Sequence, residues 1–279
     1  KGIWELLLGA VYKMVIAAGA YKVMGYLDTG TAWYHYAGYA YAYGMYLFFD
    51  FAGYSLMALG SGRILGVDLP ENFKMPFISV DIRDFWDRWH ISLSSWFREY
   101  LYIPLGGNRV SSTRTLLNLS IVFLATGIWH GAAWTFVAWG AWHGAFILLE
   151  RVTGWHKRDV AGCGCVIRHL YALLVVIFGW VLFRAESFAQ ATGFFKAMLC
   201  FTSEHVVDLE ELFFFTPLDI VMAIAAFVCA TPLAAGLLKV ADARGLRGAF
   251  VHAYLGLLFY LSIVQITAST YNPFIYFRF

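Results

Sequence analysis

Two histidines set among tryptophans are the residues of this sequence best suited to chemistry. His90 ends the run FWDRWH and His130 lies in the run WHG, each in or beside strongly apolar sequence. A titratable side chain at membrane depth is costly and is retained mainly where it has a function. Imidazole can take or give a proton near neutral pH. We therefore predict that His130 and His90 carry acid–base chemistry inside a membrane.

Each of these histidines also has a structural alternative. His130 would then be a buried side chain bonded to a backbone carbonyl, and His90 an interfacial residue of an amphipathic helix. Glycines at 127 and 131 leave room for another group beside His130, which favours function there. If His143 shared one straight helix with His130, the two would lie about 20 Å apart along its axis. They could not share a substrate atom, so we expect a structural role for His143.

Four arginines near these histidines have two possible roles. A guanidinium matches a phosphate or a carboxylate bidentately, so they could bind an anionic ligand. They could equally anchor the chain on the cytoplasmic side of a membrane, where Lys and Arg accumulate, and we favour this interpretation. The four are Arg88, Arg98, Arg109 and Arg114.

Other kinds of site are not indicated. The serines at 92, 94 and 95 lack the glycine-flanked turn of a serine hydrolase nucleophile. Cys163 and Cys165 could form half of a metal site, but the sequence holds no matching half, so we predict no metal.

The composition indicates an integral membrane protein. Hydrophobic residues make up 61% of the 279 residues and charged residues 14%, and the mean hydropathy is +0.64. Soluble domains carry about 25% charged residues. An aromatic content of 19% fits helices whose Trp and Tyr lie at headgroup level. The net charge of +2, without a basic run, gives no indication of nucleic-acid binding.

Apolar runs of about 20 residues are candidate transmembrane helices, and these must position the histidines. The candidate runs are 3–27, 33–59, 116–129, 132–149, 170–183, 218–238 and 249–267. The two runs on either side of His130 form one long helix or two helices broken at Gly131. We predict an all-α membrane protein of about six to eight helices in a single domain, residues 1–279.

The segment 81–105 is too polar for a helix that faces lipid. We predict an amphipathic or re-entrant helix covered by protein, ended by Pro104 and followed by a turn at 105–109. Polar stretches at 69–76, 150–168 and 241–247 are predicted loops.

At these residues the sequence resembles a known family. The segment 84–109, DFWDRWHISLSSWFREYLYIPLGGNR, resembles the signature of the membrane-bound O-acyltransferases, in particular the bacterial branch that contains the alginate O-acetylation proteins. The segment 127–136, GIWHGAAWTF, is similar to the family's active-site histidine segment. Further similarity lies in DFAGYSLMALG (50–60), PENF (70–73) and NPFIYFRF (272–279). Because family members are nearly twice as long, we expect this chain to be their C-terminal part, without the first helices.

The resemblance implies a helical bundle around a tunnel through the bacterial inner membrane, crossed several times by the chain. It implies His130 as the catalytic residue and His90 as a second polar site residue, with supporting roles for Arg88, Trp89, Arg98, Asn108 and Trp129. It implies an acetyl thioester such as acetyl-CoA as donor substrate and no bound cofactor. Membrane lipid, periplasmic acetyltransferase partners and a polysaccharide acceptor pathway are the implied partners.

We therefore predict O-acetylation of an alginate-like exopolysaccharide, with His130 as general base and His90 helping to stabilise the oxyanion. One alternative is transfer of D-alanine to teichoic acid by a related family member. Another is a transporter or scaffold whose histidines relay protons or bind haem.

Overall fold

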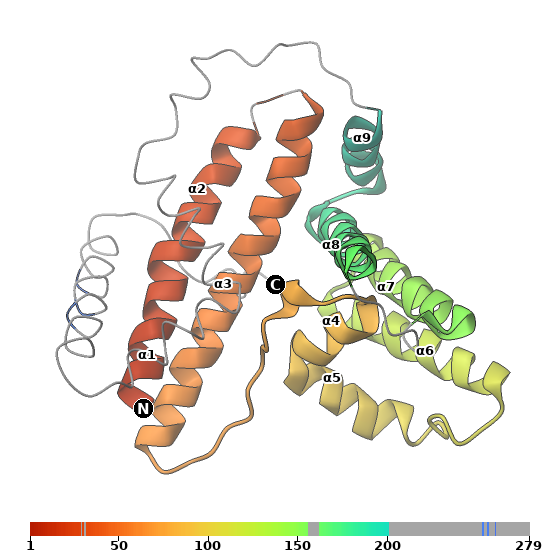
Figure 1. Cartoon of the computed structure of the whole chain (residues 1–279), viewed down its shortest axis with the longest axis horizontal. Coiled ribbons are helices and arrows are strands. Elements are labelled where there is room, and N and C mark those ends of the chain that lie inside the picture. The colour runs from red at the N-terminus through yellow and green to blue at the C-terminus, as the bar shows by residue number, and fades with distance from the viewer. Residues whose placement is uncertain are drawn as a thin grey trace. The chain divides into compact units, whose positions relative to one another are not determined.

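The structure, a computed structural model, describes residues 1–155 except 29 and 31, residues 162–200, and the single residues 253, 256 and 260. All regular structure in these ranges is helical (Figure 1). They fall into two compact units, Lys1–Glu71 and Asn72–Cys200. The predicted spans 218–238 and 249–267, the loop 241–247 and the segment 272–279 lie outside the described residues.

The first unit is an antiparallel pair of long helices. One runs from Gly2 to Leu27 as α1 (Gly2–Val11), the π-helical segment η1 (Tyr12–Ala17) and α2 (Ala18–Leu27), and α3 (Trp33–Ile64) packs against it. A Cβ atom on Gly9 would lie 2.5 Å from the carbonyl oxygen of Gly53, so two glycines permit this close approach. Lys13 and Asp50 form a buried ion pair between the two helices.

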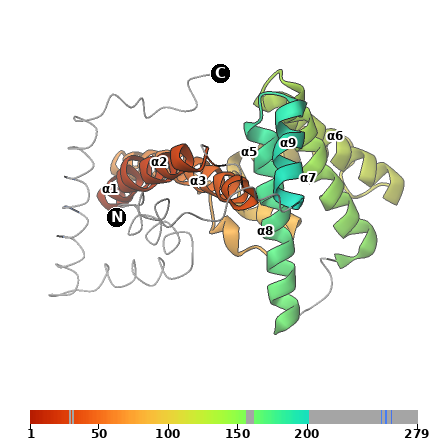
Figure 2. The ribbon, with the colours of Figure 1, turned by 90° about the horizontal axis from the view of Figure 1, so that it is seen from above.

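The second unit begins with short helical segments and continues with longer helices. The short segments are η2 (Pro76–Ile78), α4 (Ile82–Arg88), α5 (Ile91–Phe97) and the π-helical η3 (Arg98–Tyr102). The longer ones are α6 (Ser112–His130), α7 (Trp134–Thr153), α8 (Cys163–Arg184) and α9 (Phe188–Leu199). Figure 2 shows α6 and α7 together with α8, which packs on α7.

The helices α6 and α7 form an antiparallel hairpin that fixes the position of His130. Only residues 131–133 connect them. The backbones touch at Gly127, where an added Cβ atom would lie 2.5 Å from the carbonyl oxygen of Phe136. The two apolar runs around His130 are therefore two helices and not one, because the chain reverses after His130.

Two predictions about the elements are wrong in part, and one helix was not predicted. The single amphipathic helix expected over 81–105 is divided into α4, α5 and η3, because Trp89 is extended and His90 adopts a left-handed φ of 45°. The loop expected at 150–168 is shorter, since α7 continues to Thr153 and α8 begins at Cys163. The 12-residue helix α9 was not predicted, because it is shorter than the apolar runs of about 20 residues by which helices were sought.

Two of the described helical stretches are long and apolar enough to cross a membrane, Gly2–Leu27 and Gly164–Arg184. The larger set of spans, and the tunnel that they would surround, stays a prediction.

Candidate active site

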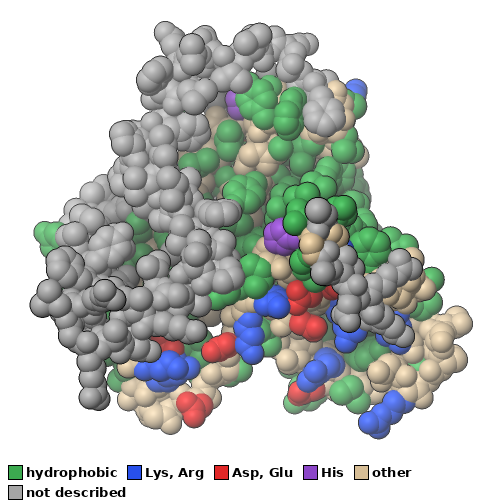
Figure 3. Space-filling model, viewed as in Figure 1, with side chains coloured by type: hydrophobic (Ala, Val, Ile, Leu, Met, Phe, Trp, Pro, Cys, Tyr) green, Lys and Arg blue, Asp and Glu red, His purple; other side chains and the backbone are tan. Residues whose placement is uncertain are grey.

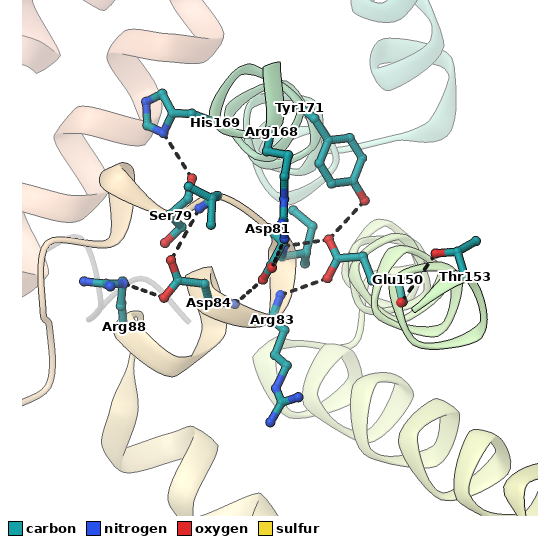
Figure 4. Close-up of polar contacts among 12 residues, drawn as sticks. Ser79, Asp81, Arg83, Asp84, Arg88, Glu150, Thr153, Arg168, His169 and Tyr171 are labelled. Carbon is teal, nitrogen blue, oxygen red and sulfur yellow. Dashed lines mark hydrogen bonds and ion pairs between the residues drawn. The ribbon is translucent and has the colours of Figure 1, made fainter. Parts of the chain in front are cut away.

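The start of α4 is held by a carboxylate from another helix. Glu150 of α7 accepts hydrogen bonds from the backbone N–H groups of Ile82 (2.7 Å) and Arg83 (3.2 Å), as Figure 4 shows for the Arg83 contact. Asp81 caps the same helix by accepting from the N–H of Asp84 at 2.7 Å. These bonds satisfy amide groups that have no partner within a helix. A seven-residue helix is not stable by itself, so α4 depends on this capping.

The same cluster ties α4 to α8. The Tyr171 hydroxyl donates to Glu150 at 3.1 Å, and the Arg168 guanidinium donates to Asp81 at 2.7 Å (Figure 4). Both Arg168 and Asp81 side chains are buried. A ring nitrogen of His169 lies 3.0 Å from the carbonyl oxygen of Ser79. Three helices are thus joined by polar contacts just ahead of the FWDRWH segment.

The other end of α4 turns sharply to present His90. Trp89 packs against Trp180, with ring centroids 5.0 Å apart, and stacks on Phe85 at 5.5 Å. Arg88 is bonded to Asp84 at 2.7 Å and donates to the carbonyl oxygen of Lys74 at 3.3 Å. Arg88 and Trp89 therefore hold the turn in place.

His90 itself is buried at this turn. It lies between two seven-residue helices, each too short to span a membrane. Burial lowers the pKa of His90 to about 4, so the imidazole is neutral near pH 7. A neutral imidazole has one N–H donor and one acceptor nitrogen.

His130 is the last residue of α6 and lies among aromatic rings. Its ring centroid is 4.9 Å from those of Trp129 and Trp139 and 5.1 Å from that of Phe183, all in edge-on geometry. The Trp129 ring centroid is also 6.2 Å from that of His90. The structure thus brings the two predicted histidines together around Trp129, although they come from different elements.

His143 occupies a separate, fully buried position on α7. Its ring packs against Trp86 at 5.3 Å and Trp139 at 5.2 Å, and its Nδ1 atom has no hydrogen-bond partner in the described part of the chain. Of the two arrangements left open by the sequence, the structure has two helices, because the turn after His130 folds α7 back along α6. The separation of about 20 Å, which assumed one straight helix, therefore does not apply. Both imidazoles consequently pack against Trp139 of α7. His130 approaches it from the end of α6, and His143 lies one helical turn after it on α7.

The predicted supporting residues Arg98 and Asn108 lie elsewhere in the second unit. They line a cavity of about 350 Å³ that none of His90, His130 or Trp129 lines. The turn before Asn108 is fixed by Asn118 of α6, whose side-chain amide donates to the carbonyl oxygens of Leu105 (3.1 Å) and Gly107 (3.2 Å).

The site holds the residue types needed for acid–base chemistry. Two imidazoles lie near one tryptophan, and aromatic rings surround that of His130. Within the described ranges, no group of three His, Cys, Asp or Glu side chains is suited to hold a metal ion.

Sequence reasoning missed the polar cluster of Asp81, Glu150, Arg168 and Tyr171. The bonded partners of this cluster are separated by 21 to 87 positions in the sequence, so no short motif reveals that they meet. The one local signal is the charge of Glu150 directly after the apolar run 132–149, where the sequence predicts the start of a loop.

Comparison with known proteins places these residues in a family context. The family model for MBOAT, the membrane-bound O-acyltransferase family, matches residues 16–189. The chain is 39% identical to a probable alginate O-acetylase of Azotobacter vinelandii, over 100% of this chain and 62% of that protein. It is 38% identical to a peptidoglycan O-acetyltransferase of Helicobacter pylori, over 57% of this chain and 30% of that protein. It is 39% identical to a teichoic acid D-alanyltransferase of Bacillus subtilis, over 47% of this chain and 36% of that protein. The chain thus spans less than two thirds of the length of these relatives.

Proposed function

Because the chain belongs to the membrane-bound O-acyltransferase family, we propose that it transfers an acetyl group from a thioester donor to a hydroxyl group of an exported polysaccharide. The observation that carries the proposal is the meeting of His130 and His90 at Trp129. The names of the relatives, an alginate O-acetylase and a peptidoglycan O-acetyltransferase, support acetyl as the group and a glycan as the acceptor.

In the proposed mechanism His130 is the general base. It removes the proton of the acceptor hydroxyl, whose oxygen attacks the thioester carbonyl carbon. Collapse of the tetrahedral intermediate forms the ester, breaks the carbon–sulfur bond and returns the proton from His130 to the departing thiolate. His90, held neutral by burial, donates its N–H to the oxyanion of the intermediate. The aromatic rings around His130 limit hydrolysis of the donor by water.

The setting of the reaction is part of the same proposal. The protein lies in the bacterial inner membrane with several spans, uses acetyl-CoA or another acetyl thioester, and works with periplasmic acetyltransferase partners. Two apolar helices and the membrane-bound family support this location.

Transfer of D-alanine to teichoic acid is a second candidate, supported by the similarity to the Bacillus subtilis protein over about half of this chain. The same assay distinguishes the two, because the transferred group is either acetate or D-alanine.

The test is replacement of His130 by Ala in the full-length protein, with acetate measured on the exported polysaccharide. We expect at least about a hundredfold loss, in the range for removal of a general base. His143→Ala, expressed to the same level, is the matched control and should retain more activity. Wild-type acetylation by the His130 variant, or an equal loss in a folded His143 variant, would contradict the assignment.

A further inference from the structure

The segment 72–74 pairs with the turn that carries His90. The N–H of Lys74 donates to the carbonyl oxygen of Arg88 at 2.9 Å, and the N–H of Ile91 donates to the carbonyl oxygen of Asn72 at 3.0 Å. These two bonds lie on either side of His90 along the chain. The segment begins inside the PENF motif (70–73), whose residues take no part in the proposed mechanism.

The pairing has the residue count of a β-bulge. Residues 72 and 74 are two positions apart, whereas their partners 88 and 91 are three positions apart, so the side that contains His90 carries one extra residue. Bulges are frequent next to active sites, where the extra residue redirects a side chain. The pairing therefore fixes the direction in which the chain leaves α4.

The backbone of His90 has a conformation that a histidine rarely adopts. Its φ of 45° and ψ of 52° lie in the left-handed region. Among the described residues, only His90 and Met75, which directly follows the segment 72–74, are non-glycine residues with a positive φ. Such conformations persist where the surrounding contacts hold them. The bonds on either side of His90 are contacts of this kind.

The side chain of Asn72 holds the chain directly after His90. Its Oδ1 atom accepts hydrogen bonds from the N–H of Ser92 at 3.2 Å and from the Ser92 hydroxyl at 2.9 Å. His90 is the N-cap residue of the seven-residue helix α5, and Asn72 supplies a capping oxygen from outside that helix. Together with the bond from Ile91, Asn72 accepts three hydrogen bonds from the two residues that follow His90.

We propose that Asn72 is a positioning residue that holds His90 in its left-handed conformation and so determines where the imidazole meets the reacting carbonyl. This rests on the proposed function, because it takes His90 to donate to the oxyanion there. A catalytic donor must be held to within about 0.5 Å of its productive position, which requires support from neighbouring residues. Phe73 supports the same turn, since its ring packs edge-on against Trp89 with the centroids 5.0 Å apart.

The contacts of Asn72 with Ser92 lie at the surface, which makes them suitable for substitution. Figure 3 shows acidic and basic side chains gathered where Figure 1 places α4 and α5, so water reaches this part of the molecule. Water replaces part of a hydrogen bond that is lost at an exposed position. We therefore expect variants of Asn72 to fold.

The first experiment measures hydrogen–deuterium exchange of the full-length protein in detergent by mass spectrometry. Asn72→Ala should speed exchange of the backbone amides of residues 91–94 about fivefold, as expected for loss of an exposed helix cap. Asn72→Asp keeps a capping oxygen and should exchange like the wild type. Ser92→Ala loses only the hydroxyl bond and should show a smaller increase in the same amides. The matched control is Ser111→Ala, which removes the side-chain cap of α6 and should affect only the start of that helix.

The second experiment measures acetate on the exported polysaccharide. Asn72→Ala should lower it about tenfold, because a small displacement of a catalytic group is costly, and Asn72→Asp should restore most of it. In a His90→Gln background, Asn72→Ala should have little further effect, because the residue that it positions is already lost.

Unchanged exchange at residues 91–94 in Asn72→Ala would overturn the proposal. An equal loss of acetate with and without His90 would also overturn it, because Asn72 would then act independently of His90. If exchange changes as expected but His90→Gln acetylates like the wild type, or the wild type transfers no acetate, the assignment of Asn72 to the turn stands and the proposed function alone is refuted.

Discussion

Replacement of Glu150 tests whether one buried carboxylate holds α4 in place. In Glu150→Ala the N–H groups of Ile82 and Arg83 and the hydroxyl of Tyr171 lose their partner. An unsatisfied buried polar group costs about 1–3 kcal/mol, so we expect a loss of roughly 3 kcal/mol or more in the free energy of unfolding. Glu150→Gln retains one carbonyl oxygen as acceptor and should lose about half as much.

The assay is thermal unfolding of the purified protein in detergent, followed by circular dichroism. For a chain of this size, 3 kcal/mol corresponds to a decrease in Tm of about 6–12 °C. Hydrogen exchange should rise in α4 and at Trp89 and His90, because the capped helix leads into that turn. Glu186→Ala is the matched control, since this side chain is 83% exposed and lies 3.7 Å from Arg184. The reasoning fails if Glu150→Ala and Glu186→Ala unfold at the same temperature, or if exchange in α4 is unchanged.

Two further predictions concern buried histidines. Gly179→Ala should destabilise the protein by about 1–3 kcal/mol, because the new Cβ atom would lie 2.7 Å from Nε2 of the enclosed His143. Gly193→Ala on α9 meets no atom within 4 Å and should be neutral or slightly stabilising in the same melting experiment; equal effects would contradict the packing argument. His90 has a folded pKa of about 4, below the value of 6.5 for an exposed His, so its contribution to stability is complete above pH 6.5 and is lost as the pH falls toward 4. His90→Gln should therefore flatten the dependence of Tm on pH in that interval, by up to about 3 kcal/mol of the pH-dependent stability, and an unchanged slope would show that His90 is not the responsible group.

The sequence was informative where local pattern determines structure. Apolar runs located the helices Gly2–Leu27, α3, α6 and α7 to within several residues, because helix burial follows composition. The tryptophan-flanked histidines could be selected as candidate site residues on two grounds: the free-energy cost of a titratable side chain in a membrane, and the ability of imidazole to transfer a proton. Their family was recognisable from motifs at 84–109 and 127–136, and the family match confirms it.

Contacts between distant segments could not be predicted in this way. The reversal after His130 depends on the packing of Gly127 against α7. The spacing of residues along one helix gives no information on such a contact between two helices. Trp129 as the meeting point of His90 and His130, and Glu150 as the cap of α4, also arise only from the tertiary fold. The roles of Arg88, Trp89, Arg98, Asn108 and Trp129 in catalysis stay predictions.

The buried ion pair of Lys13 and Asp50 constrains how the first two long helices assemble. Each helix contributes one charge, and either charge alone in an apolar environment costs several kcal/mol, while the bonded pair is much less costly. The helix Gly2–Leu27 is therefore poorly suited to enter the bilayer in isolation, even though its hydropathy permits it. If Gly2–Leu27 crosses a bilayer, the pairing of Lys13 with Asp50 favours its entry together with α3 over its entry alone. A chain that ended before Asp50 would leave Lys13 without this partner.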